Sequence, residues 1–143
     1  MLLHDIAQYS RPGRNVGLFE IVVGSCENID ADACAPPYGE DQWGAPPLII
    51  AARRNHSAFV EILLRHGANP LTRDKTIFAD SALTWAVYND HYEIAKLLVR
   101  RSDLKIQTLS DGNNLLVWAH QYSGMKIFHL LVENNCDPDV ENF

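Results

Sequence analysis

The chain has 143 residues, of which 47% are hydrophobic, and its formal net charge is −6 at pH 7. This length and composition predict one globular domain, and the negative charge disfavours nucleic acid or an anionic membrane surface as a partner and favours a basic protein. No apolar run approaches the about 18 residues of a membrane-spanning helix, and the first residues lack a secretion-signal pattern, so we expect a cytoplasmic protein. The three cysteines show no paired spacing, so we expect reduced thiols.

The N-terminal region predicts two helices joined by a long link. Apolar residues between positions 2 and 7 predict the first helix, and those between positions 18 and 23 predict a second helix that ends near Ser25. The link between them contains Pro12 and Gly13, which favour a turn. We interpret residues 1–43 as an irregular version of the helical pair that follows.

Residues 27–43, which we call the acidic finger, have the composition of a loop. They contain proline, glycine and five carboxylates, and no basic residue. One interpretation is a solvated loop, and the other is an arm that contacts a partner. Asp30 and Asp32 alternate as calcium ligands can, but the central glycine and the glutamate at position twelve of a calcium loop are missing, so no calcium site is expected.

Residues 44–70 predict two short helices and a stop. Pro46 and Pro47 suit the first turn of a helix, where the missing amide hydrogen costs least. Apolar residues then recur at intervals of three and four until Gly67, which favours the left-handed turn at a helix end. Neither helix reaches the roughly 12 to 15 residues at which an isolated helix becomes marginally stable, so neighbouring copies must cover it.

Two further copies follow. Leu48, Leu83 and Leu116 occupy the same place in three matched frames, separated by 35 and 33 residues. Near-equal spacing of this kind is typical of a stacked repeat, in which each unit buries one face against the next. The chain is thus predicted to be one domain over residues 1–143, with the irregular unit first and repeats at about 44–76, 77–110 and 111–143.

The first matched frame resembles the ankyrin repeat, in which a Thr-Pro-Leu-His start, two alanines, Gly-His and a final Gly-Ala-Asp follow one another. The matching residues here are Pro46-Pro47-Leu48-Ile49, Ala51-Ala52, Asn55-His56 and Gly67-Ala68-Asn69. The resemblance covers Gly44 to the C-terminus, although His120 replaces an alanine and Ser102 and Asn135 replace the final glycine. It implies an all-α ankyrin-repeat solenoid of about four helix-turn-helix repeats with projecting loops or β-hairpin fingers.

The resemblance also implies where a partner protein would bind, namely on the finger tips and the exposed side of each first helix. Aromatic and polar side chains recur at those positions, and large amphipathic rings give much contact area for little rotamer entropy. The candidate partner-binding residues are Trp43, Arg53, Arg54, Trp85, Tyr88, Asn89, Trp118, Gln121 and Tyr122.

Two structural alternatives remain open for these residues. Trp85 and Trp118 could instead pack between neighbouring first helices, where Ala86 and Ala119 leave space. Arg53 and its neighbour Arg54 could hold a carboxylate of the partner or could pair with the acidic finger.

No catalytic, cofactor-binding or metal-binding residue is predicted. His56 and His91 stand at equivalent places, where the ankyrin pattern uses histidine to bond neighbouring loops. The other histidines lack a partner at the spacing of a metal pair, and no phosphate loop or nucleophile elbow is present.

These patterns predict a non-enzymatic protein-binding module that is monomeric when free. The favoured interpretation is a stand-alone masking inhibitor, of the kind that immunity proteins with ankyrin-like repeats represent. The alternative is the recruiting part of a larger adaptor, ubiquitin-ligase receptor or bacterial effector; Pro47 to Arg53 is similar to the opening repeats of some cullin-ligase receptors. An enzyme is the remote third possibility.

Overall fold

The computed structural model of the protein describes residues 6–7, 9–26, 45–74, 80–101 and 115–134. Ile6 and Ala7 are helical and buried, while the rest of the first predicted helix lies mostly outside the described residues. The helices that follow are α2 (Val16–Ser25), α3 (Pro47–Arg53), α4 (Ser57–Arg65), α5 (Ala82–Tyr88), α6 (Tyr92–Val99), α7 (Leu115–Tyr122) and α8 (Met125–Glu133).

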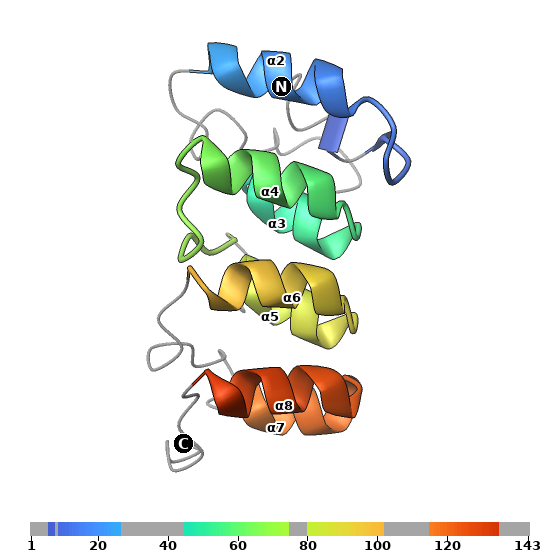
Figure 1. Ribbon diagram of the computed structural model, residues 1–143, viewed down its shortest axis with the longest axis vertical. Coiled ribbons are helices and arrows are strands. Elements are labelled where there is room, and N and C mark those ends of the chain that lie inside the picture. The colour runs from blue at the N-terminus through green and yellow to red at the C-terminus, as the bar shows by residue number, and fades with distance from the viewer. Residues whose placement is uncertain (1–5, 8, 27–44, 75–79, 102–114, 135–143) are drawn as a thin grey trace.

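The helices form a stack of pairs along the long axis of the molecule. Figure 1 shows α3 with α4, α5 with α6, and α7 with α8 in successive layers, and α2 above them. First helices contact first helices and second helices contact second helices, in the order α3, α5, α7 and α2, α4, α6, α8. Within the described ranges there is no β-strand, only one isolated bridge. The predicted all-α repeat solenoid is therefore confirmed.

The core runs the length of this stack. Leu48, Leu83 and Leu116 are all buried in their respective first helices, as the matched frames predicted. Because each helix has only seven to ten residues, its stability comes from burial against its neighbours. The repeat frame read from the sequence is therefore the frame of the core.

The ends of the helices form as the local sequence predicts. Pro47 is the first residue of α3, and Ser81 caps α5 by accepting a hydrogen bond on Oγ from the backbone N–H of Thr84 at 3.3 Å. After α4, Gly67 has φ 90°, and its N–H donates to the carbonyl of Leu64 at 3.2 Å. The N–H of the buried Ala68 donates to the carbonyl of Leu63 at 2.9 Å, which completes a Schellman motif.

The turns between paired helices bond to one another from repeat to repeat. Nδ1 of His91 lies 2.9 Å from the carbonyl oxygen of Ala52, one repeat earlier. Ser123 Oγ donates to the carbonyl of Val87, and the N–H of Gly124 donates to Oδ1 of Asp90 at 2.9 Å. These bonds fix the register of neighbouring pairs, and the expected structural role of His91 is observed.

The equivalent His56 has a different environment. Its Nδ1 is buried and has no hydrogen-bond partner of normal geometry, and the turn of the preceding repeat is replaced by the longer link of residues 10–15. Desolvation lowers the pKa of His56 below 6.5; the Ser10 backbone acts in the opposite direction, and Arg54 lowers the pKa further.

Acidification is therefore expected to weaken the fold at His56. The pKa of this ring is lower in the folded chain than in the unfolded chain, so the unfolded state binds the proton first as the pH falls through 6.5. The free energy of unfolding should decrease in that range and should be fully restored above it. Histidine NMR titration of the folded protein, with a short unfolded peptide around His56 as reference, measures the shift. A folded-state pKa equal to or above that of the peptide would contradict this prediction.

The first repeat is joined to the second by an aromatic pair. The rings of Phe19 on α2 and Phe59 on α4 stack with centroids 3.9 Å apart and planes 6° from parallel, and both are buried. An exposed ion pair between Glu20 and Arg65 lies beside the same contact. This buried ring pair joins α2 to α4.

The segment from Leu71 to Asp80, between the second and third repeats, is the second finger, and only its base is described. Arg73 and Ser81 form the isolated antiparallel bridge, and the N–H of Asp74 donates to the carbonyl of Asp80 at 2.9 Å. These two contacts join the two ends of the second finger. The acidic finger, residues 75–79 of the second finger and residues 102–114 lie outside the described residues, as do the predicted repeat boundaries that fall in them.

Candidate functional site

Four aromatic rings and one guanidinium form a continuous surface across three repeats. We call it the aromatic surface; it consists of Arg53 on α3, Trp85 and Tyr88 on α5, and Trp118 and Tyr122 on α7. The paired rings of one helix are three or four residues apart and therefore share a side of that helix. Stacking of the repeats then places the sides from successive first helices next to one another.

The rings contact one another in a compact group. The centroid of Tyr88 lies 5.5 Å from that of Trp118 and 5.2 Å from that of Tyr122, and Trp118 lies 5.4 Å from Tyr122. Trp85 meets Tyr88 edge to face at 6.2 Å. These tilted contacts lie in the favourable range for aromatic pairs, so the side chains hold each other in place.

Trp85 is held from two further sides. Its Nε1–H donates to Oδ2 of the buried Asp74 at 3.2 Å, and Cζ of Arg53 lies 5.7 Å from the centre of its ring. A guanidinium at this distance from an indole makes a cation–π contact. Trp85 is therefore anchored to the base of the second finger and to the preceding repeat.

The structure separates the rings into two groups, the partly buried tryptophans and the exposed tyrosines. Trp85 and Trp118 are half-buried and pack against the core, so each has a structural role as well as a solvent-facing edge. Tyr88 and Tyr122 are exposed, with 44% and 47% of their surface accessible. The tyrosines provide most of the accessible aromatic area.

The structure describes some, but not all, of the remaining predicted partner-binding residues. Arg54, Asn89 and Gln121 are exposed, and the side-chain amide of Asn89 donates to the carbonyl of Trp85 at 2.9 Å, which closes the end of α5. Trp43 and the acidic finger lie outside the described residues, so the pairing of Arg53 or Arg54 with that finger stays a hypothesis.

Sequence reasoning did not find Asp74. The residue lies between Arg73 and Lys75 in a polar segment, which gives no sign that its carboxylate is buried. Its role depends on the folded base of the second finger, where Oδ1 accepts from the N–H of Asp80 at 3.1 Å and Oδ2 accepts from Nε1–H of Trp85 at 3.2 Å. Only the folded backbone brings these groups together.

Among the described residues, no group of three or more His, Cys, Asp or Glu side chains could hold a metal ion. No helix in the same ranges is both long and apolar enough to cross a membrane.

Comparison with known proteins gives consistent matches. The family pattern described as ankyrin repeats (3 copies) matches residues 10–108 and 48–142. The chain is 29% identical over 102 residues to a potassium channel, AKT2/3, of Arabidopsis thaliana, and 23% identical over 151 residues to the ANK repeat-containing protein nipk-1 of Caenorhabditis elegans. These alignments cover 71% and 96% of the chain but only 12% and 24% of the two relatives, so the chain spans a minor part of each. Since the family pattern matches most of its length, the chain belongs to the ankyrin-repeat family, whose repeats form protein–protein interaction modules.

Proposed function

We propose that this protein binds a partner protein, without catalysing a reaction, through the aromatic surface. The observation that carries the proposal is the exposure of Tyr88 and Tyr122 within a ring group that is already ordered by its own contacts. Exposed tyrosines packed in this way lose little conformational freedom when a partner covers them. The surface is therefore suited to act as the energetic centre of an interface.

Two arginines add positive charge at one edge of the aromatic surface. Arg53 lies over the ring of Trp85, and its neighbour Arg54 is exposed. Arginines beside aromatic rings are frequent at the centres of protein interfaces, where they bond carboxylates or carbonyls of the partner. The chain as a whole carries a net charge of −6, which favours a partner that is basic overall and is met in the cytoplasm.

The favoured form of this function is masking, in which the stack inhibits its partner by covering it. The recruiting form, in which the stack brings a partner to a larger assembly, is favoured by one observation: both relatives are much longer than this chain. The two forms differ in a measurable way. A masking protein lowers the activity of a captured partner at a one-to-one ratio, whereas a recruiting protein leaves that activity unchanged.

Replacing Tyr88 and Tyr122 by alanine is expected to weaken partner capture without unfolding the chain. Each truncation removes a large ring from the proposed centre of the interface, and a loss of about tenfold in affinity per ring is typical of such a position. Immobilised protein incubated with native lysate, followed by mass spectrometry, identifies the partners and compares the variants. Circular dichroism should show the wild-type helix content.

The matched control is Tyr9→Ala. Tyr9 is also an exposed tyrosine, but it lies in the first repeat and is not one of the residues of the aromatic surface. Its truncation should leave capture unchanged. Equal capture by wild type and by the double variant, or equal loss in Tyr9→Ala, would contradict the proposed location of the site.

A further inference from the structure

A buried carboxylate joins the second finger to the aromatic surface. Asp74 is 5% exposed, and its two side-chain oxygens accept hydrogen bonds from different elements. Oδ1 accepts from the backbone N–H of Asp80 at 3.1 Å, and Oδ2 accepts from Nε1–H of Trp85 at 3.2 Å. The backbone N–H of Asp74 also donates to the carbonyl of Asp80 at 2.9 Å. One residue therefore bonds both the far end of the finger and a ring of the aromatic surface.

The carboxylate of Asp74 links the geometry of these two bonds. A buried carboxylate needs hydrogen-bond donors to offset its lost hydration, and bonds to an ionised acceptor are about twice as strong as neutral ones. Because the two oxygens belong to one planar group, a rotation that lengthens the bond to Asp80 also displaces the oxygen that holds Trp85. The joined ends of the finger and the direction of the indole are thus not independent.

The direction of the Trp85 ring in turn affects two neighbours on the aromatic surface. The ring meets Tyr88 with planes 87° apart, and Cζ of Arg53 lies 5.7 Å from its centre. Both contacts depend on ring direction, since a cation binds the face of an indole and an edge-to-face pair needs nearly perpendicular planes. A Trp85 side chain that rotated freely would lose both contacts.

We propose that Asp74 is a positioning residue for partner binding, which couples the joined ends of the second finger to the orientation of Trp85 and thereby orders the aromatic surface. The role rests on the proposed binding function, because it concerns the same surface. A coupling free energy is reciprocal, so a change at either bond of Asp74 should alter the other bond. This reciprocity can be measured without the partner.

Asp74→Asn tests the coupling at nearly constant volume. An amide has one acceptor oxygen, and its nitrogen can only donate, so one of the two donors must lose its acceptor on this side chain. The oxygen should stay with the buried N–H of Asp80, because an unsatisfied group costs more there than at the half-buried Trp85. In proton–nitrogen NMR spectra, the indole signal of Trp85 should shift and its proton should exchange with solvent about tenfold faster. The signal is assigned by its absence in Trp85→Phe.

Trp85→Phe tests the coupling from the other side. The substitution removes the N–H donor and keeps an aromatic ring, while the bond between Asp74 and Asp80 is not itself changed. The backbone amide of Asp80 should nevertheless lose hydrogen-exchange protection, because Asp74 is no longer held by the indole.

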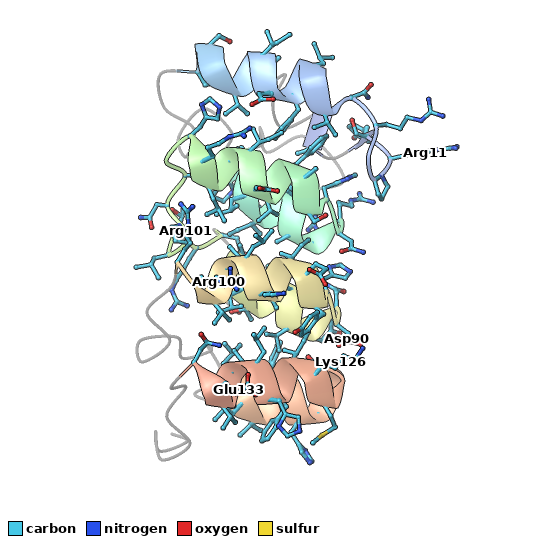
Figure 2. The ribbon with its side chains drawn as sticks, in the orientation of Figure 1. Arg11, Asp90, Arg100, Arg101, Lys126 and Glu133 are labelled. Atoms are coloured by element: carbon cyan, nitrogen blue, oxygen red, sulfur yellow. The ribbon has the colours of Figure 1, made fainter. Side chains whose placement is uncertain are left out.

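The matched control is Asp90→Asn. Asp90 is an exposed aspartate at the turn between α5 and α6 (Figure 2), and its Oδ1 accepts from the N–H of Gly124 at 2.9 Å. The control removes the same charge, and a single amide oxygen can still accept this bond. Asp90→Asn should leave the indole signal of Trp85 and the protection of Asp80 unchanged.

Partner capture from native lysate tests the positioning role. Asp74→Asn should weaken capture about fivefold, because a loosened surface must be ordered again when the partner binds, whereas Asp90→Asn should not. Since Asp74 acts through Trp85, adding Asp74→Asn to Trp85→Phe should cause no further loss of capture. A residue that only supports the fold would weaken both backgrounds equally. Circular dichroism of every variant should match that of the wild type.

The outcomes separate this role from the proposed function. An unchanged indole signal in Asp74→Asn, or full protection of Asp80 in Trp85→Phe, would overturn the coupling whatever the capture result. A shifted signal with full capture by Asp74→Asn, or a further loss in the double variant, would overturn the positioning role. Full capture by the alanine variants of Tyr88 and Tyr122 would contradict the proposed site itself, and the NMR measurements would still decide whether Asp74 couples the finger to the ring.

Discussion

Replacing Leu83 by alanine is expected to lower the free energy of unfolding by about 2 to 5 kcal/mol. Leu83 is fully buried in α5, the helix that contacts both α3 and α7, so its removal leaves a cavity at the centre of the stack. Short helices cannot move far to fill that cavity, because their turns are bonded to neighbouring turns. Urea denaturation followed by circular dichroism measures the loss.

The matched control for this variant is Leu18→Ala. Leu18 is a leucine of α2 whose side chain is exposed, and surface substitutions of this kind usually change stability by no more than about 0.5 kcal/mol. The comparison separates loss of packing from loss of a leucine as such. If Leu83→Ala unfolded at the same urea concentration as wild type, the stacked core described above would be wrong.

Phe19→Ala is expected to cost about 3 to 5 kcal/mol, most of it in the first repeat. The substitution removes a buried ring and its stacking contact with Phe59, which joins α2 to the rest of the chain. In a repeat stack each unit contacts only its neighbours, so the loss should be local. Amide hydrogen exchange should show α2 losing protection while α5 and α6 keep theirs.

A conservative variant tests the role of stacking in this contact. Phe19→Leu keeps most of the apolar volume but removes the ring pair, so its loss should be smaller than that of Phe19→Ala. Unchanged protection of α2 amides in Phe19→Ala would show that other contacts hold the first repeat. Equal loss of protection along the entire chain would show that the repeats unfold as one unit.

The repeat frame could be predicted because the same pattern of residues occurs three times in the chain. Leu48, Leu83 and Leu116 recur at near-equal spacing, and each copy supports the assignment of the others. Burial of all three confirms the frame. Gly67 likewise marked the end of α4, because its left-handed conformation follows from the residue type. Local chemistry and repetition are both visible without coordinates.

Contacts made between segments could not be predicted in this way. The hydrogen bond from Trp85 to Asp74 depends on the backbone of the second finger. His56 and His91 looked equivalent in the sequence, yet Nδ1 of His91 lies 2.9 Å from the carbonyl oxygen of Ala52, whereas Nδ1 of His56 is buried without a hydrogen-bond partner of normal geometry. The grouping of Tyr88 with Tyr122 likewise required the offset between successive first helices, since the two residues are not at equivalent places in the frame.

The bonds between successive turns have a mechanical consequence. They join residues 39, 36 and 34 positions apart in the sequence, from His91 to Ala52, Ser123 to Val87 and Gly124 to Asp90. Each of these bonds reaches one repeat and no farther. A pulling force applied to the two ends would therefore detach helical pairs one after another, and the extension curve would rise in small successive steps instead of one large rupture.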